Sequence, residues 1–348
     1  MKTLSKFLLG ALALGMHASL ANAQTTRLNS YDDLVQKVSA AEEKIAAPAA
    51  AAAPAVNCCP TVDCCNSCDN NCERGHFYGM WESVVVTPHF TRNDAFNGDP
   101  NTTFTQLEWD MKYSPRFELG YLAAGDRLGF RMRYWHFDND QSLTASSGDV
   151  EIIISDDPEI DLQTDGNVDI NHELKLRVLD LEAMKRNGGL LFSGGIRYAR
   201  MDQNFRATDI DNFVSSEHDF EGVGPTVALE GRHRLGNGSL TLFATGRGSV
   251  LFGESNWTAS DAVDALFRTN DGDVLPIGEL QLGVDWSRET RRGGLAFLRV
   301  ALEGQYWISA GSGMKTDLGT SSNDGGVADP QEPDMGLIGF TIGAGFAR

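Results

Sequence analysis

Six cysteines form the densest cluster of reactive side chains in this sequence. They all fall within fifteen residues: Cys58, Cys59, Cys64, Cys65, Cys68 and Cys72. In an exported protein, an even number of closely spaced thiols favours disulfide bonds, although six thiols allow fifteen pairings and the sequence selects none. A metal site is the alternative, because Cys65 and Cys68 have a spacing that zinc favours, but a second such pair at the usual distance is missing. We therefore expect disulfides, within or between chains, and no bound metal or cofactor.

Histidine and serine do not form a recognisable catalytic pattern. His89, His136, His172 and His218 stand apart from any serine-containing nucleophile turn and have no metal-triad spacing. The glycines form no strand-to-helix phosphate loop. Folding could still bring a serine and a histidine together in a membrane-embedded hydrolase, but the sequence predicts a protein that is not an enzyme.

The ionised residues exclude one class of partner and leave two fold classes open. The 29 Lys and Arg residues against 48 Asp and Glu residues give a formal net charge of −19, which opposes binding to nucleic acid. A hydrophobic content of 41% fits a soluble protein. It also fits a transmembrane β-barrel, because barrel strands alternate apolar and polar residues. Beyond residue 23, no apolar stretch approaches the roughly 20 residues of a membrane-spanning helix.

The first 76 residues read as an export signal and an appendage. Residues 1–23 have a charged start, an apolar stretch and the cleavage site Ala21-Asn22-Ala23 of a secretory signal peptide. Residues 24–76 follow. A heptad-like spacing in residues 31–46 predicts a short helix or a small oligomerising stalk, and residues 47–56 form an Ala/Pro linker before the cysteines. Homo-oligomerisation through this segment is an open alternative.

From Phe77 onward, apolar residues recur at every second position. Residues 128–134, 190–198, 280–286 and 296–302 each show this alternation, which is typical of strands with one apolar and one polar face. Tight turns alternate with long polar connections if residues 103–123 form one strand bent near Pro115. Ten strands are then predicted, at 78–91, 103–123, 127–138, 171–186, 189–205, 217–234, 238–256, 276–288, 294–309 and 335–347.

An even-numbered antiparallel meander with short turns on one rim and long loops on the other is typical of an outer-membrane barrel, whose termini are periplasmic. We expect an all-β, up-and-down transmembrane barrel of about ten strands, within a range of 8 to 12. Its girdle aromatics would be Tyr134, Trp135, Phe205, Trp257, Tyr306 and Trp307 at the outer rim, and Phe77, Tyr78, Trp81, Trp286 and Phe346 at the other. The alternative is a soluble β-sandwich with these aromatics in its core.

If the apolar face meets lipid, the polar face lines the lumen. The candidate pore-lining residues are Arg131, Arg133, Lys175, Arg177, Arg197, Arg232, Arg247, Arg299, Glu118, Glu230, Glu279, Asp285 and Glu303. In a barrel only slightly wider than eight strands, such side chains can meet across the lumen and leave little continuous water. Ion pairs that only satisfy the interior and a conducting path are both open readings. Residues 174–180 break the alternation, which predicts a β-bulge.

Excess negative charge gathers in the long connections. Between residues 139 and 170 there are nine acidic residues and no Lys or Arg. We expect a solvated acidic loop that enriches cations at the mouth of the barrel. A calcium site around Asp161, Asp165 and Asp169 is the alternative, but the spacing misses the twelve-residue calcium loop.

Several segments within residues 77–348 are familiar. Arg133-Tyr134-Trp135 and Gly222-Val223-Gly224-Pro225 are the least generic of them; residues 117–121, 128–135, 179–182, 193–198 and 278–284 are the others. They resemble the pore-forming outer-membrane β-barrel family first associated with Legionella, which has many planctomycete members. The resemblance implies the outer membrane of a Gram-negative-type bacterium, insertion by the barrel-assembly machinery and a porin-like role. The chain departs from the family by following Phe346 with Ala347 and Arg348, where a terminal aromatic is common.

The sequence therefore predicts three parts: a signal peptide (1–23), the N-terminal helix, linker and Cys-rich segment (24–76), and an outer-membrane barrel (77–348). Outer-membrane lipid and the barrel-assembly machinery are the expected partners. Two functions stay open. One is a narrow channel for small solutes or ions, and the other is a plugged structural barrel that anchors a cysteine-crosslinked periplasmic stalk.

Overall fold

The computed structural model describes residues 75–91, 94–96, 105–124, 128–145, 150–156, 159–164, 166–236, 239–291, 293–311 and 333–348. The predictions for the signal peptide, the N-terminal helix, the Ala/Pro linker and the six cysteines lie outside these ranges. Within these described residues, no helix is long and apolar enough to cross a membrane.

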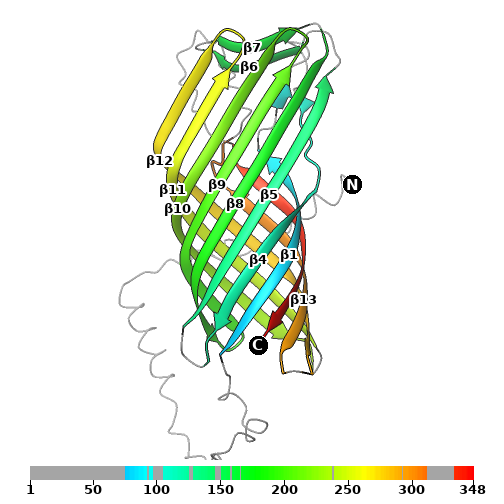
Figure 1. Cartoon of the computed structure of the whole chain (residues 1–348), viewed down its shortest axis with the longest axis vertical. Helices are drawn as coiled ribbons and strands as arrows, with labels where there is room; N and C mark the ends of the chain where they lie inside the picture. The colour runs from blue at the N-terminus through cyan, green and yellow to red at the C-terminus, as the bar shows by residue number, and fades with distance from the viewer. Residues whose placement is uncertain are drawn as a thin grey trace, which may run out of the picture. The chain divides into compact units, whose positions relative to one another are not determined.

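In the described part of the chain, ten long strands close into an antiparallel barrel (Figure 1). They are β1 (His76–Phe90), β4 (Lys112–Leu122), β5 (Gly129–Ala145), β8 (Val168–Asn187), β9 (Leu190–Thr208), β10 (Phe213–Arg234), β11 (Leu240–Ser260), β12 (Ala265–Glu289), β13 (Leu295–Trp307) and β14 (Met335–Ala347). Each strand pairs with the next one along the chain, and β14 closes the barrel on β1. The predicted ten-stranded all-β barrel is confirmed.

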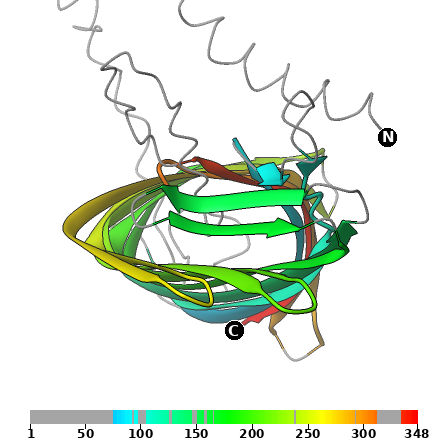
Figure 2. The same ribbon diagram turned by 90° about the horizontal axis from the view of Figure 1, so that it is seen from above.

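Two short hairpins interrupt the long connections. β2 (Asp94–Phe96) pairs with β3 (Thr105–Gln106), and β6 (Val150–Asp156) pairs with β7 (Glu159–Thr164). The β6–β7 hairpin crosses the mouth of the barrel at the end opposite the short turns (Figure 2). The acidic stretch 139–170 is therefore largely strand and not the expected open loop, because its apolar residues Ile152, Ile160 and Leu162 are buried.

The glycines of the familiar segments have a steric role. A Cβ at Gly224 would overlap the carbonyl oxygen of Val250 on β11, and one at Gly195 would overlap that of Leu181 on β8. Only glycine lets these strands approach their neighbours so closely.

The barrel wall inverts its polarity along its length. We call the half next to the short turns the membrane zone; it comprises residues 179–187 of β8 and 190–198 of β9. There the apolar residues face outward and the charged residues inward: Leu181 is 54% exposed and Ile196 59%, whereas Asp180 and Arg197 are fully buried. An apolar outer face over a charged interior is the pattern of a membrane-spanning barrel.

The half next to the long connections, which we call the outer zone, has the opposite polarity. It comprises residues 168–178 of β8 and 199–208 of β9. Leu174, Leu176 and Phe205 face inward and are buried, whereas Arg177 and Asn204 face outward and are exposed. An apolar interior with a polar exterior is the arrangement of a protein surrounded by water. The strands thus extend beyond the hydrocarbon, which about ten residues per strand would cross.

The predicted bulge at residues 174–180 is wrong. β8 pairs with β5 and with β9 without a register shift over this whole stretch. The alternation only reads as broken because outward side chains are polar as far as Arg177 and apolar from Leu179. The break in the alternation therefore reflects a change of the medium around the barrel wall, from water to lipid, and not an inserted residue.

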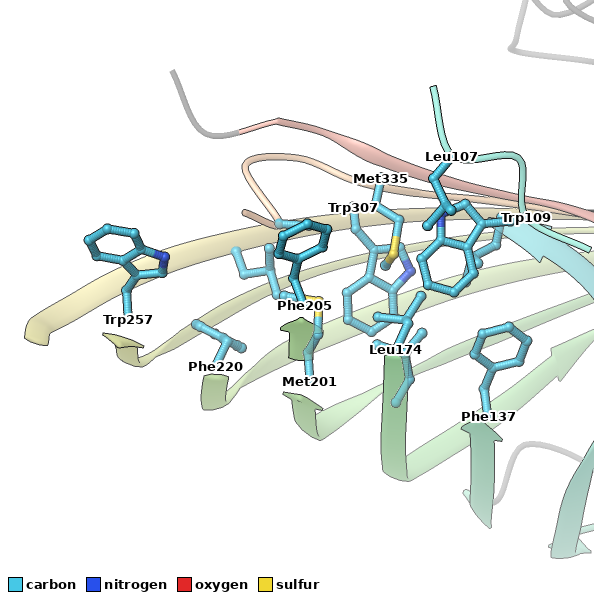
Figure 3. Packing of buried hydrophobic residues seen from close by; sticks show 14 of the residues in the cluster. Leu107, Trp109, Phe137, Leu174, Met201, Phe205, Phe220, Trp257, Trp307 and Met335 are labelled. Carbon is cyan, nitrogen blue, oxygen red and sulfur yellow. The ribbon is translucent and has the colours of Figure 1, made fainter. Parts of the chain in front are cut away.

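The outer-zone interior is a packed apolar core (Figure 3). Four of the residues predicted for the outer girdle belong to it: Trp135, Phe205, Trp257 and Trp307 are at most 7% exposed. Tyr134 and Tyr306 do face outward. Trp81, Trp286 and Phe346 of the opposite rim are also exposed. Tyr78 of that rim faces inward, and its hydroxyl group donates to Glu118 at 2.8 Å. The girdle prediction was therefore right for the residues with outward parity and wrong for the five with inward parity, which are Tyr78 and the four in the core.

Candidate functional site: the ionic lumen of the membrane zone

Most of the predicted pore-lining residues meet inside the membrane zone. Strand alternation directs them inward because their neighbours along each strand are apolar and face outward. The inward-facing predicted residues are Arg131, Arg133, Arg197, Arg247, Arg299, Glu118, Glu230, Glu279, Asp285 and Glu303. Whether they line a pore is a separate question, which depends on how they pair.

One ion pair crosses the whole lumen. Arg133 lies on β5 and Glu279 on β12, and these strands are diametrically opposite in the order of the closed barrel. The Nη2 atom of Arg133 donates a hydrogen bond of 2.8 Å to Oε2 of Glu279. Two long side chains from opposite walls therefore meet in the middle of the barrel.

Glu279 and Asp180 each bind more than one arginine. Arg197 of β9 also pairs with Glu279, and its Nε donates to Asp180 at 2.6 Å. Arg133 donates to the same Asp180 at 2.9 Å. Arg247 of β11 pairs with Glu182 of β8 and lies 3.6 Å from Glu279. These residues form a continuous lattice of alternating charge that joins β5, β8 and β9 to β11 and β12.

A second cluster centres on Arg116 of β4. Its guanidinium donates to Glu82 of β1 at 2.6 Å and forms a bidentate pair with Glu303 of β13 at 2.7 and 2.8 Å. Gln281 and Gln305 each donate to Glu303 at 2.8 Å. This arrangement satisfies a carboxylate in a region with almost no solvent, since the side chains of Arg116 and Glu303 are each 1% exposed.

Three predicted residues lie outside this buried cluster. Lys175 and Arg177 belong to the outer zone and share the outward parity of Leu179. In the outer zone the outward residues are the polar ones, so these two side chains face away from the lumen. Arg232 lies at the short-turn rim, where it is 40% exposed and pairs with Glu230 and with Asp285 at 3.2 Å.

Four lumen residues were missed by the sequence analysis: Glu82, Arg116, Asp180 and Glu182 are all buried in the membrane zone. Asp180 and Glu182 share the inward parity of Met184 on β8. The sequence signal for them is the change in polarity of the outward residues between Arg177 and Leu179, which shows that the even-numbered residues face inward along the whole strand. Arg116 follows Pro115, where a bend was predicted. β4 instead runs unbroken through that proline and pairs with β1 on both sides of it.

The fold and the lumen define this protein as an outer-membrane β-barrel. The sequence matches the family model described as Legionella pneumophila major outer membrane protein precursor over residues 72–347, and the chain belongs to this family. Family and fold together locate it in the outer membrane of Gram-negative bacteria.

The comparisons with other known proteins give distant similarities. The outer membrane protease OmpT from Escherichia coli is 8% identical with a TM-score of 0.39, and the match covers 78% of this chain and 96% of OmpT. The β domain of the Bordetella autotransporter BrkA is 12% identical with a TM-score of 0.35, covering 79% and 99%. The Pseudomonas putida toluene transporter TodX is 8% identical with a TM-score of 0.28, covering 79% and 90%. No curated protein matches the sequence.

Proposed function

We propose that this protein is a structural outer-membrane barrel whose lumen is closed in the conformation described here. The observation that carries the proposal is the Arg133–Glu279 ion pair, which spans the lumen between diametrically opposite strands. Asp180, Arg197 and Arg247 surround this pair and extend the lattice toward the walls. Ions that pass here would have to separate buried pairs of opposite charge, which is costly in a low-dielectric interior.

The outer zone adds a second closure of a different kind. Side chains from opposite walls, among them Leu174 and Trp307, fill the space between the strands (Figure 3). Ile160 and Leu162 of the β6–β7 hairpin are buried in the same cluster, so that the hairpin covers this core at the mouth. A hydrophobic constriction excludes water and therefore blocks hydrated ions.

A closed barrel that is firmly held in the membrane suits the role of an anchor. β1 begins at the rim of the short turns, and barrels of this class have that rim on the periplasmic side. The segment 24–76 with its six cysteines would then be carried into the periplasm, where disulfides form. Crosslinks from this segment to a second copy or to another envelope protein complete the proposed role.

A narrow channel is the second candidate. The observation that favours it is the chemistry of the membrane-zone lumen, which is lined by charged groups and glutamines where a structural core would be apolar. If the lattice rearranged and the hairpin moved, the same groups would provide a hydrophilic path for small solutes or ions.

Planar lipid bilayers discriminate between the two candidates. The closed barrel predicts no stepwise conductance from the protein, after folding is verified by its heat-modifiable electrophoretic migration. Stepwise conductance from the unmodified protein would reject the closed barrel and support the channel. The stalk is tested on its own by electrophoresis with and without reductant: loss of a high-mass band in the variant with all six cysteines replaced by serine supports the anchor, whereas a single unlinked band under both conditions rejects the crosslink.

A further inference from the structure

Two arginines stand side by side on the outer face of the barrel, immediately beyond its apolar band. Arg177 of β8 and Arg200 of β9 are directly opposite each other in the register of the two strands. Like charges in this position repel each other and destabilise a sheet. An anion that binds to both arginines from outside the protein would offset this repulsion.

The neighbouring groups supply only part of that counter-charge. Arg200 donates to Asp202 at 2.7 Å and lies 4.0 Å from Glu221. Arg177 is exposed and has no ion pair with any residue that the structure describes. In the next outward row, Lys175 is engaged with Glu173 at 2.6 Å, and Asp138 lies opposite Lys175 on β5. On its β5 side Arg177 therefore has His136 as its cross-strand neighbour and no carboxylate partner.

The position of the pair coincides with the edge of the hydrocarbon. The row of outward residues just below contains Tyr134, Leu179 and Tyr198, which lie opposite one another on β5, β8 and β9. Tyrosine is typical of the membrane–water interface. Two residues further along these strands, about 7 Å away, the row changes to His136, Arg177 and Arg200. This is the depth at which lipid headgroups lie.

The chain is otherwise strongly acidic, with a formal net charge of −19. Two adjacent guanidiniums at headgroup depth are thus a local exception and not part of a general basic surface. Guanidinium groups bind phosphate oxygens through paired hydrogen bonds, which makes phosphate the anion that fits this pair. In the same row, the partly exposed His136 lies opposite Arg177 on β5, and Glu221 lies opposite Arg200 on β10. The hydroxyl group of Tyr198, one row closer to the membrane centre, donates to Glu221 at 2.9 Å.

We propose that Arg177 and Arg200 form a binding site for a phosphate group of an outer-leaflet lipid. The lipid would lie with its acyl chains along the apolar face of β5, β8 and β9 and its phosphate between the two guanidiniums. The site is independent of whether the lumen conducts, because it lies on the opposite face of the barrel wall.

Titration of the purified protein in neutral detergent with diphosphorylated lipid A tests the proposal. Native mass spectrometry counts the bound lipid, and the temperature at which heat-modifiable migration is lost reports stabilisation. The double variant Arg177→Gln/Arg200→Gln is expected to bind this lipid roughly tenfold more weakly or worse, because two charge-assisted contacts are removed. Arg234→Gln/Arg288→Gln, which removes two exposed arginines at the opposite rim, is the matched control and should bind like the parent.

Two further measurements protect the test from alternative explanations. In detergent without lipid, the Arg177→Gln/Arg200→Gln variant should lose its heat-modifiable migration at nearly the same temperature as the parent, because the repulsion between the two arginines and the exposed Arg200–Asp202 ion pair are removed together. Dephosphorylated lipid A should bind parent and variant equally. Equal binding of diphosphorylated lipid A by parent and double variant would overturn the proposal. So would inorganic phosphate alone stabilising the parent as much as the lipid does, because the site would then be one for a free anion.

Discussion

Arg133 and Glu279 are separated by 146 positions in the chain and by half the circumference of the barrel, yet their side chains share a 2.8 Å hydrogen bond in the centre of the lumen. Removing two charges from water is costly, and their attraction offsets this cost only when further hydrogen bonds satisfy both groups. Asp180 and Arg197 provide these bonds. The lattice is stable as a unit, and single changes in it should have large effects.

Replacing Glu279 by glutamine should destabilise the barrel strongly. Arg133, Arg197 and Arg247 would lose a shared carboxylate while their positive charges stay buried. Breaking a buried ion pair from one side costs about 3–5 kcal/mol. Urea unfolding in detergent micelles measures this cost. Glu217→Gln, which changes an exposed carboxylate of the outer zone, is the matched control and should stay within about 0.5 kcal/mol of the parent. A Glu279→Gln protein as stable as this control would contradict the lattice.

An arginine introduced on the outer face should cost more stability in the membrane zone than in the outer zone. Val227 of β10 is 64% exposed in the middle of the apolar band, and Val227→Arg places a charge near the centre of the bilayer. The expected cost is about 2–4 kcal/mol. Glu217→Arg lies on the same strand and the same face, but in the outer zone, and should cost less than about 1 kcal/mol. Unfolding measured in lipid vesicles decides. Equal costs at the two positions would show that the boundary between the zones is not the edge of the membrane.

The β6–β7 hairpin should detach when its apolar face is made polar. Ile160 is fully buried in the core cluster, and Ile160→Asp would bury an unpaired carboxylate if the hairpin stayed in place. We expect the barrel to remain folded while residues 150–164 become sensitive to limited proteolysis. Asp161→Asn changes the adjacent, partly exposed residue and should leave the protease resistance unaltered. Resistance of both variants would indicate that the hairpin is held by other contacts.

The outer-zone core should lose stability in acid through His172. The ring is fully buried among Phe90, Trp109 and Phe205, with ring centroids 4.9 to 6.0 Å away. This burial lowers the pKa of His172 from its usual 6.5 to about 3. Between these two values the unfolded chain binds a proton that the folded protein does not. Stability contributed at neutral pH is therefore lost as the pH falls from about 6.5 toward 3.

The variant His172→Phe should remove this component of the pH dependence. The free energy of unfolding measured from pH 7 to pH 4 would fall less steeply than in the parent, by about one proton per molecule at most. Other titrating groups are common to both proteins and cancel in the difference. Asn204→Gln, which changes an exposed group that does not titrate on the neighbouring strand, should leave the parent slope unchanged. An identical slope in the parent and in His172→Phe would show that His172 is accessible to protons in the folded state.

The sequence by itself determined the number of barrel strands, their antiparallel order and which residues share a face, because a period of two follows directly from strand geometry. The single strand predicted at 103–123 was wrong in its bounds: residues 105–106 form β3, which pairs with β2, and β4 begins at Lys112. It also identified ten of the charged residues that fill the lumen. Only the tertiary structure decided which medium each face meets. Alternation shows that Arg177 and Leu179 point the same way, but the polarity of their surroundings changes between them where the wall leaves the lipid.

The partners of the charged residues were likewise decided by the closed barrel. No local pattern links Arg133 to Glu279 or Arg116 to Glu303, because these contacts exist only after β14 has paired with β1 and the two walls face each other. The same limit applies to Trp135 and Trp307, which the sequence analysis placed only as aromatics near the ends of predicted strands. Their place in a buried core depended on their inward parity and on the continuation of the strands beyond the membrane, which only the folded barrel shows.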